Sequence, residues 1–547
     1  MLKEFQFEQN ALDFLAQGVI NACLPLKGTY GPYGKEVLIE SDQKKLLLTK
    51  SSAAIMQNYS DSNLFLDEGV KLVREAVLNT AEYAGDGTTL TAILIESMVK
   101  RAKTFLTAGY SYTELRKGLK DVTNEVIASL EDKKKPCTKR KQMNQMLSFH
   151  FGNSKEILLL EQALGQVGPQ GMIRFESAYG RESFGETLNG MPIFSEVITN
   201  EIFRNKQKKE LELLNPIVFV CDEVIADFSM LLPILSYANE KKRALFIIAE
   251  DITEEAKKIM EVNIKKQVIT AAAVKIKGIG KSKRDLLEDI CVYTGATFAS
   301  KKSGYDFLRL QEEVFGIGEK ITITQDKVLI RKNKCDQEEK LHHYIEHIKK
   351  QKDDCVSNVY DKERYEDRIR RLNGTVSVLY VGETTLATEK EEIRKLQSAL
   401  RMIRKSVEEG VVAGGGSALL FVAKEMLEVL AQKQSNHRVD YICGKKLLLH
   451  ALTEPFKLLC DSSEGDGLIQ FEKMKKFSYP MGYDIEKKEM RNFEECGMLD
   501  SFYVIKTAIL QAVSITYEWL STAVLMVSTK PDREDVELMK QGVPIMR

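Results

Sequence analysis

The hydrophobic pattern changes twice along this chain, and that change constrains the fold more than any other feature. Apolar residues recur at helical spacing from about residue 8 to 130, and helical patterns return from about residue 386 onward. Between about 190 and 330, short apolar strands such as PIVFVCDE (216–223) and ALFIIAED (244–251) alternate with amphipathic helical segments. Such alternation is typical of an α/β unit with a partly parallel sheet. Helical ends around an α/β middle predict an inserted domain, so both chain ends would build one body.

The composition limits the classes of protein to which the chain can belong. Its 547 residues exceed what one compact core accommodates, so about two to four domains are expected. Apolar residues make up 44% and charged residues 29%, which is typical of a soluble globular protein. The 79 basic and 79 acidic side chains cancel, which argues against a dedicated nucleic-acid binder. The sequence contains no run of about 18 uncharged apolar residues, so it predicts no membrane-spanning helix.

Cysteine usage and the first residues bear on the cellular compartment. The 9 cysteines are scattered singly, which favours free thiols in a reducing compartment over disulfides or a zinc site. The opening residues MLKEFQFEQNALDF contain acids and no uninterrupted apolar core, so they do not resemble a secretory signal. We therefore expect a cytoplasmic protein.

The stretch AGDGTT (84–89) interrupts two long helical patterns with two glycines around a single carboxylate. Glycines allow the backbone to approach a ligand closely, and the helix that follows offers unpaired N–H groups to an anion. Thr88 and Thr89 could donate hydroxyl hydrogen bonds to a phosphate, while Asp86 could hold a hard cation such as Mg²⁺. The alternative is an ordinary helix–turn–helix in which Asp86 caps the second helix.

Two further glycine-rich segments could close around the same ligand. EEGVVAGGGSALL (408–420) precedes an apolar helix but lacks the lysine of a Walker A loop, and tight helix packing is its alternative explanation. GTYGPYGK (28–35) is a Gly/Pro turn that leads into a predicted strand pair, KEVLIES (35–41) and KLLLTK (45–50). Together with AGDGTT, these segments indicate a bound phosphate compound more strongly than any one of them does alone.

Two other features have simpler explanations. GIGKS (278–282) resembles the end of a P-loop, but Lys275 stands where the first glycine is required, so we interpret it as a basic surface turn. His343 and His347 lie one helical turn apart, but no third ligand accompanies them. A metal site at these histidines is therefore the less favoured interpretation.

In this order and at these spacings, the motifs resemble those of the group I, GroEL-type chaperonins. VEEGVVAGGGSALL (407–420) together with a distant AGDGTT is highly specific, and the resemblance covers nearly the whole chain. The other matching segments are TYGPYGKEVLIES (29–41), TK (49–50), VGPQGMI (167–173), LLPILSYA (231–238), LFIIAED (245–251), YDKERYEDRIRRLNG (360–374), MGYD (481–484) and GMLD (497–500).

The resemblance implies a multidomain fold with a mainly α-helical equatorial domain, an α/β apical domain and a small α+β intermediate domain. The expected ranges are 1–133 and 409–547 for the equatorial domain, 134–188 and 376–408 for the intermediate domain, and 189–375 for the apical domain. It also implies two stacked seven-membered rings, unfolded polypeptides as partners and a lid co-chaperonin as a candidate partner. Neither nucleic acid nor a membrane is implied.

The same resemblance implies the residues of an ATP site, with Mg²⁺ and K⁺ as candidate ions. Asp86 is expected to ligate Mg²⁺, and Lys50 to contribute a backbone contact. The expected phosphate-binding positions are Thr29, Tyr30, Gly31, Pro32, Gly87, Thr88, Thr89 and Leu90, and the expected nucleoside-binding positions are Gly415, Asp484 and Asp500.

Two positions depart from the family where hydrolysis is concerned. Ser398 replaces an aspartate that orients the attacking water, and Ser51 replaces a second aspartate that follows Thr-Lys. Serine carries no charge near neutral pH, and losing a general base lowers a rate by a factor of about 10²–10⁴. Glu391 lies seven residues before Ser398, about 10 Å along a helix, and is not expected to substitute.

The predicted client-binding face departs as well. Leu232 and Leu235 keep an apolar helix, but Lys257 and Glu261 fall on positions that are apolar in the family. Charges at the centre of an apolar groove weaken it by desolvation, so client and lid binding are expected to be weakened. The apolar candidates that remain are Val262, Ile198, Ile202 and Phe203.

The sequence therefore predicts an ATP-binding chaperonin subunit that assists the folding of other polypeptides in a ring, with hydrolysis weakened by the loss of both acids. The alternative is a non-hydrolysing scaffold or regulatory paralogue that mixes with an ordinary chaperonin. Both interpretations retain ATP binding and differ in turnover.

Overall fold

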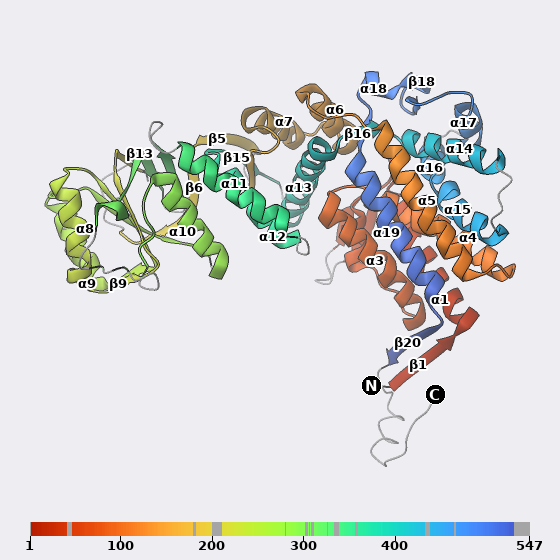
Figure 1. The fold of residues 1–547 in the computed structure, drawn as a ribbon, viewed down its shortest axis with the longest axis horizontal. Helices are drawn as coiled ribbons and strands as arrows, with labels where there is room; N and C mark the ends of the chain where they lie inside the picture. The colour runs from red at the N-terminus through yellow and green to blue at the C-terminus, as the bar shows by residue number, and fades with distance from the viewer. Residues whose placement is uncertain are drawn as a thin grey trace, which may run out of the picture. The chain divides into compact units, whose positions relative to one another are not determined.

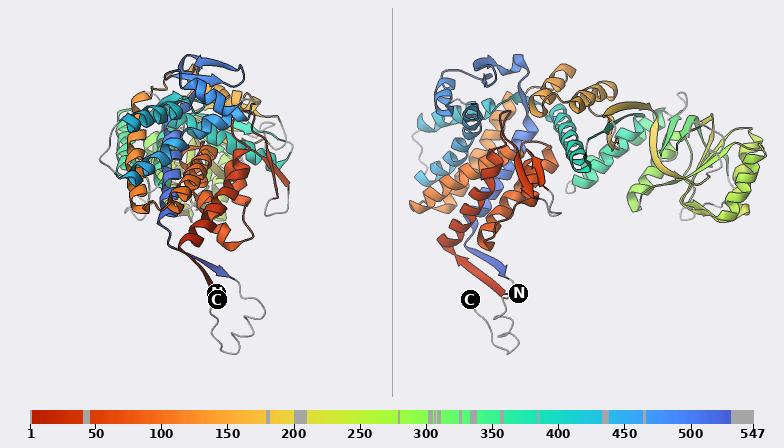
Figure 2. Two further views of the ribbon diagram at one scale, coloured as in Figure 1. Left: turned by 90° about the vertical axis from the view of Figure 1, so that its right-hand side faces the viewer. Right: turned by 180° about the vertical axis from the view of Figure 1, so that it is seen from behind.

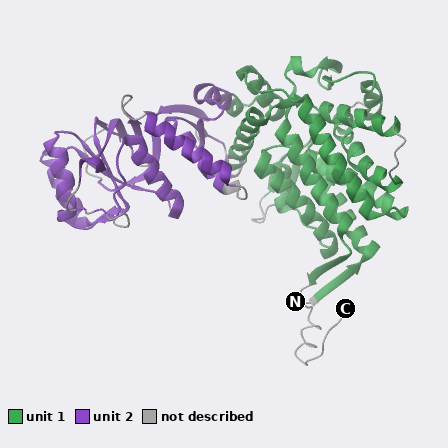
Figure 3. Cartoon of the chain, viewed as in Figure 1, with its two compact units in different colours: residues 1–158, 390–547 green, residues 159–389 purple. Residues whose placement is uncertain are grey.

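The computed structural model divides the chain into two compact units (Figure 3). Unit 1 combines residues 1–158 and 390–547, and unit 2 consists of residues 159–389. Both chain ends thus build one unit, while the finer division into three domains stays a prediction. The structure describes residues 2–40, 46–178, 182–199, 210–278, 280–300, 305, 307, 311–324, 327–332, 338–355, 359–383, 385–432, 438–463 and 466–529.

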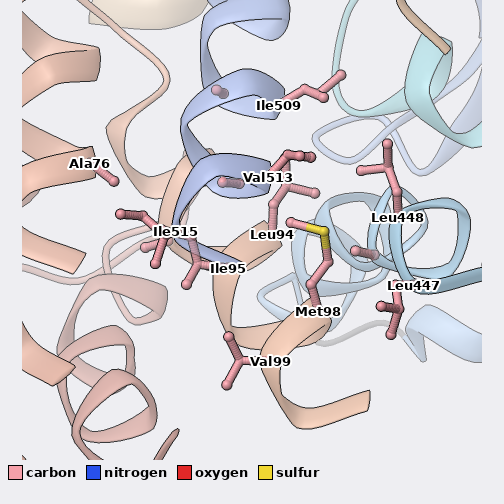
Figure 4. Close-up of a cluster of buried hydrophobic side chains, with 14 of the residues drawn as sticks. Ala76, Leu94, Ile95, Met98, Val99, Leu447, Leu448, Ile509, Val513 and Ile515 are labelled. Atoms are coloured by element: carbon pink, nitrogen blue, oxygen red, sulfur yellow. The ribbon is translucent and has the colours of Figure 1, made fainter. Parts of the chain in front are cut away.

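Long helices pack side by side in unit 1 (Figure 1). Helix α4 (Thr88–Thr107) is central, and almost every residue from Leu90 to Val99 is buried. The helices that pack around it and against one another are α1 (Glu8–Lys27), α3 (Leu64–Ala84), α5 (Tyr112–Lys133), α15 (Val439–Ala451) and α19 (Phe502–Ser521). Figure 4 shows Leu94 and Met98 of α4 in one cluster with Leu448 and Val513. A helix that is apolar all round needs partners on every side, so the two chain ends share this core.

Helices α1 and α3 approach each other closely at a pair of glycines. A Cβ atom added to Gly69 would lie 2.4 Å from the carbonyl oxygen of Leu15, and one added to Gly18 would lie 2.0 Å from that of Leu66. Close-packed interiors leave no space for an added methyl group at such a crossing. The absence of side chains at Gly18 and Gly69 therefore sets the distance between the two helices.

We expect Gly69→Ala to lower the free energy of unfolding by about 1–3 kcal/mol, because the added methyl group forces the two backbones apart. Gly28→Ala is the matched control, since Gly28 has a right-handed helical conformation and the nearest atom to an added Cβ is 3.5 Å away. Urea denaturation of both variants measures the difference. Equal stability of the two variants would contradict the close approach of α1 and α3.

Short antiparallel strand pairs and further helices complete unit 1. The strand pairs are β1 (Leu2–Phe7) with β20 (Val524–Thr529), β2 (Val37–Glu40) with β3 (Leu46–Thr49), β16 (Val411–Ala413) with β19 (Leu499–Ser501), and β17 (Met481–Asp484) with β18 (Glu489–Asn492). The pairing of β2 with β3 confirms the two strands predicted at 35–41 and 45–50. Strands β1 and β20 run side by side away from the helices (Figure 2). The further helices are α2 (Ser52–Asn58), α6 (Arg140–Phe151), α14 (Ser417–Gln432), α16 (Glu454–Asp461), α17 (Gly467–Met474) and α18 (Phe493–Cys496). The borders between the two units fall within α7 (Lys155–Val167) and α13 (Leu386–Glu409).

Unit 2 is built on a mixed sheet with the strand order β14-β6-β12-β10-β8-β13-β7. Its central strands β8 (Ile217–Val220), β10 (Leu245–Ala249) and β12 (Ala271–Ile276) are parallel, which confirms the predicted partly parallel sheet. The antiparallel strands are β6 (Met191–Val197), β7 (Leu211–Leu214), β13 (Gly316–Ile323) and β14 (Lys327–Lys332). Because side chains alternate along a strand, the sheet contributes to two cores, such as Phe219 to one and Val218 to the other.

Helices cover both faces of this sheet. One core contains α8 (Phe228–Glu240) and α9 (Glu254–Lys265), and the other contains α10 (Gly280–Thr294), α11 (Glu338–Asp354) and α12 (Val359–Leu372). Helix α12 ends before Gly374 (φ 73°), at the predicted Asn-Gly stop. The shorter elements are β9 (Val224–Ile225), β11 (Asp251–Ile252) and the 3₁₀ turn η3 (Glu312–Val314).

A smaller sheet completes unit 2, with β15 (Thr375–Val381) between β4 (Met172–Ser177), to which it is parallel, and β5 (Phe184–Asn189), to which it is antiparallel. The predicted multidomain fold, with helical parts and a mixed-sheet part, is confirmed. Among the described residues, no helix combines the length and apolar character needed to cross a membrane.

Candidate functional site

The turn between α3 and α4 holds Asp86 between two glycines in left-handed conformations. Gly85 (φ 78°) ends α3, and Gly87 (φ 84°) is the N-cap of α4. The Gly87 N–H donates a hydrogen bond to Oδ1 of Asp86, with an N···O distance of 2.7 Å. Asp86 therefore does not cap α4 itself, which corrects the helix–turn–helix alternative. Its carboxylate lies beside a helix N-terminus, where backbone N–H groups and the helix dipole favour anions.

A side chain could not replace either glycine of this turn. A Cβ atom added to Gly87 would lie 2.6 Å from Cγ1 of Val504, in α19. At Gly85 an added Cβ would lie 2.6 Å from the carbonyl oxygen of Ser398, in α13. The predicted catalytic position Ser398 thus lies directly against the turn that carries Asp86.

The second predicted catalytic position, Ser51, also lies near this turn. The neighbouring Ser52 hydroxyl is 2.7 Å from the Thr89 hydroxyl in the first turn of α4. Ser51 is the N-cap of α2, and its Oγ accepts a hydrogen bond from the Ala54 N–H at 3.3 Å. Serine and aspartate are comparably good N-caps, so this substitution removes a charge without removing the cap.

Strand β3 contacts α13 beside these serines. The Thr49 hydroxyl donates a hydrogen bond to Oε1 of Glu391 at 3.0 Å, and it accepts one from the Ser51 N–H at 3.0 Å. Lys50, the predicted backbone contact, has an exposed side chain. A carboxylate of α13 is therefore hydrogen-bonded to the segment that contains Ser51.

The glycine-rich segment at 414–416 lies against Asp500. Strand β16 places Val412 opposite Asp500 of β19, and a Cβ atom added to Gly414 would lie 2.8 Å from Oδ1 of Asp500. Gly415 has a left-handed conformation (φ 59°), and its missing Cβ would lie 3.1 Å from the ring of Phe493. The structure thus brings the predicted nucleoside positions Gly415 and Asp500 together.

The predicted residue Asp484 has other partners. Its Oδ1 accepts the N–H groups of Glu486 and Lys487 at 3.1 Å each, and its Oδ2 lies 3.2 Å from Nη1 of Arg491. These contacts close the turn between β17 and β18. The Asp484 side chain is only 2% exposed, and its carboxylate is hydrogen-bonded within this hairpin.

The turn at 28–35 borders the same carboxylates. Burial raises the pKa of Tyr30 above its usual value, and the negative charges of Asp500 and Asp86 nearby raise this pKa further. Gly31 (φ 78°) packs on α16, since its missing Cβ would lie 2.4 Å from Cδ2 of Leu459. The Thr29 hydroxyl donates to the Leu26 carbonyl at 2.8 Å. Pro32, at the tip of the turn, is exposed.

His150 of α6 joins the two carboxylates, and sequence reasoning missed it. Its Nδ1 lies 3.1 Å from Oδ2 of Asp86, while its Nε2 lies 3.3 Å from Oδ1 of Asp500 and 3.0 Å from the Leu499 carbonyl oxygen. Burial alone would lower the pKa of His150, but hydrogen bonds and charges of both aspartates raise this pKa well above its usual value. Both contacts therefore favour the protonated form of the imidazole over the neutral form.

The same contact affects Asp86. Burial alone would raise the pKa of Asp86, but the hydrogen bond and charge of His150, together with the Gly87 N–H, lower this pKa below its usual value. The two aspartates lie on opposite sides of the imidazole ring, each bound to a different nitrogen. No sequence signal linked His150 to residues 64 and 350 positions away.

The donor set fits a cation that brings further ligands with it. Within the described residues, no group of three His, Cys, Asp or Glu side chains could hold a metal ion by itself. Mg²⁺ is commonly held by one or two carboxylates plus phosphate oxygens and water, so Asp86 fits Mg²⁺ bound together with phosphates. His343 and His347 do not converge: His347 contacts Gln351 at 3.0 Å, and His343 lies 4.0 Å from Glu346.

On unit 2, the described part of the predicted client-binding face keeps some exposed apolar side chains beside charged ones, and Phe228 (42% exposed) lies one turn before Leu232 on α8. Leu232 of α8 and Val262 of α9 are 46% and 47% exposed, whereas Leu235 is buried in the core. Lys257 and Glu261 of α9 are partly exposed beside them. Ile198 is partly buried against the core, and Ile202 and Phe203 lie outside the described residues.

Comparisons with known proteins identify a matching family and proteins of similar fold. A family model described as the TCP-1/cpn60 chaperonin family matches residues 25–164 and 225–529. The chaperonin gp146 from the bacteriophage EL 2 (Pseudomonas aeruginosa), crystallised in the presence of ATP-BeFx, has a similar fold. One crystal form gives a TM-score of 0.69 at 18% identity, covering 96% of this chain and 99% of that chain. A second form gives a TM-score of 0.61 with the same identity and coverage.

Proposed function

Because this chain belongs to the TCP-1/cpn60 chaperonin family, we propose that it is a ring-forming chaperonin subunit that binds ATP with Mg²⁺ at the Asp86 turn. Chaperonins form ring oligomers and bind unfolded polypeptides. We extend both properties to this chain, with partners that are copies of itself or of an ordinary paralogue. The 8 described cysteines are all free thiols, which supports a reducing, cytoplasmic location.

The observation that carries the proposal is the meeting of separate backbone turns around Asp86 and Asp500. The turn at 28–32, the segment 49–52, the turn at 85–89 and the glycines at 414–416 come from distant parts of the chain. Glycines with positive φ and an exposed helix N-terminus are suited to bind phosphates through backbone N–H groups. A packed helix junction alone would not need carboxylates beside these glycines.

Each part of the site has a role in this proposal. The N–H groups of Thr88, Thr89 and Leu90 in the first turn of α4, beside Gly87, would bind the phosphates together with residues 29–32 and the Lys50 backbone. Asp86 would hold Mg²⁺, which neutralises phosphate charge when it is bound. Gly415 and Asp500 would contact the nucleoside. Asp484 would act indirectly, by closing the β17–β18 hairpin that Phe493 packs against.

We further propose that hydrolysis is weak. Ser51 and Ser398 both lie at the Asp86 turn, but neither carries the charge needed to activate or orient a water molecule. Ser51 still caps α2, so its substitution leaves the local fold intact. This combination also supports the second candidate function, a scaffold or regulatory subunit that binds nucleotide within mixed rings.

Ring assembly and client binding test the chaperonin role. We expect the purified chain, alone or mixed with an ordinary chaperonin, to appear in rings by negative-stain microscopy. We also expect it to suppress aggregation of a chemically unfolded client protein, measured by light scattering with and without ATP. Rings formed only in the mixture would support the regulatory role. A chain that enters no ring and holds no client would contradict both functions.

A further inference from the structure

Both carboxylate oxygens of Asp86 are engaged in this structure. Oδ1 accepts the Gly87 N–H at 2.7 Å, and Oδ2 lies 3.1 Å from Nδ1 of His150. The Gly87 bond belongs to the turn itself and follows from its backbone conformation. Oδ2 is the oxygen that contacts the imidazole of His150. A cation that binds Oδ2 on the side facing Nδ1 takes the place of this imidazole.

His150 has a second set of contacts that would remain after such a displacement. Its Nε2 lies 3.0 Å from the Leu499 carbonyl oxygen and 3.3 Å from Oδ1 of Asp500. The neighbouring ring of Phe149 packs edge-on, with ring centroids 5.0 Å apart. The side chain therefore keeps its place on the Asp500 side, and only the contact with Asp86 competes with a metal.

We propose that His150 sets the metal affinity of the site: its imidazole occupies the metal-binding oxygen of Asp86, and the metal–nucleotide complex binds by displacing it. This inference rests on the proposed nucleotide function and adds a residue that acts against the metal. Displacement also removes the direct contact between α6 and the α3–α4 turn. Metal binding is thereby linked to the position of α6.

The test compares metal-dependent with metal-free nucleotide binding. We expect His150→Ala to tighten ADP binding in the presence of Mn²⁺ by about tenfold, the effect of removing one hydrogen bond to the Asp86 carboxylate that competes with the metal. Binding of ADP in EDTA is not expected to tighten, because His150 contacts carboxylates and a carbonyl oxygen. The ratio of the two affinities is the readout, measured with a fluorescent ADP analogue. A purely structural role would move both affinities together.

Two further variants make the test specific. His150→Gln keeps a side chain of similar reach that can still donate a hydrogen bond to Asp86, and it is expected to give an intermediate ratio if His150→Ala folds poorly. Lys141→Ala removes an exposed basic side chain from the same helix and is expected to leave the ratio unchanged. Hydrogen exchange of α6 should rise when Mn²⁺ and ADP are added to the unmodified chain. In His150→Ala, α6 should exchange quickly before any addition.

An unchanged ratio in His150→Ala, or weaker Mn²⁺-dependent binding, would overturn the inference. Failure of the proposed function looks different, since neither the unmodified chain nor any variant would then retain ADP with or without metal. In that case no metal–nucleotide complex binds at Asp86, and the inference about His150 is overturned together with the proposed function.

Discussion

Ser398→Asp is expected to raise steady-state ATP turnover by about 10²-fold, within the range of about 10²–10⁴ that a positioned general base contributes. The backbone of Ser398 lies against Gly85, one residue from Asp86. Nη1 of Arg401, one turn later, donates to the Ala81 carbonyl at 3.1 Å and fixes this part of α13 against α3. An aspartate at 398 would therefore add a carboxylate beside the phosphates without rebuilding the helix. Phosphate release under saturating ATP, Mg²⁺ and K⁺ measures the effect.

Gln397→Asp is the matched control, because it places the same charge on the adjacent, exposed position of α13. It is expected to leave turnover unchanged. The variant with both Ser51→Asp and Ser398→Asp should exceed the product of the single effects, since the two carboxylates would act on one water molecule. If Ser398→Asp binds ATP normally and hydrolyses it no faster than the unmodified chain, the loss of this acid does not explain weak hydrolysis.

Asp86→Asn is expected to weaken Mg²⁺-dependent nucleotide binding by about two orders of magnitude, because a neutral amide cannot replace the carboxylate as a ligand for a hard cation. The Asn side chain keeps the size of Asp86, and the amide oxygen can still accept the Gly87 N–H. Titration of a fluorescent ADP analogue at several Mg²⁺ concentrations measures the change.

Asp484→Asn is the control for this second prediction, since Asp484 is tied to Arg491 in the β17–β18 hairpin. It should lower stability by about 1–3 kcal/mol, the effect of a weakened buried charged hydrogen bond, while the Mg²⁺ dependence of binding stays as it was. The opposite pattern, with metal dependence lost in Asp484→Asn and kept in Asp86→Asn, would place the metal elsewhere.

Parts of the site could be predicted because some positions there accept only one type of residue for a clear physical reason. The glycines of AGDGTT and of 414–416 occupy conformations with positive φ or positions where a Cβ would clash, and this demand is visible in a sequence. The strands at 35–41 and 45–50 were predictable from two short apolar runs joined by a polar turn. The parallel strands of unit 2 were predictable from their short, continuous apolar runs.

The residues that were missed depend on contacts between distant segments. His150 is a single histidine on α6, and only the fold places it between Asp86 and Asp500. Phe493 packs between Gly415 and Gly482, a contact with no local pattern. Asp484 differs from these residues, because its partner Arg491 is local, seven residues away in the same hairpin, while its ligand role stays a prediction. Side-chain partners follow from tertiary packing, so a linear pattern does not reveal them.

We propose that the chain binds ATP and hydrolyses it weakly, because Asp86 lies at a helix N-terminus between two glycines while Ser51 and Ser398 carry no charge. The most direct test measures Mg·ATP binding and steady-state hydrolysis on the same preparation of the unmodified chain, next to an ordinary chaperonin. We expect saturable ATP binding with turnover at least about 10²-fold below that of the ordinary chaperonin. Turnover equal to that of the ordinary chaperonin would contradict it.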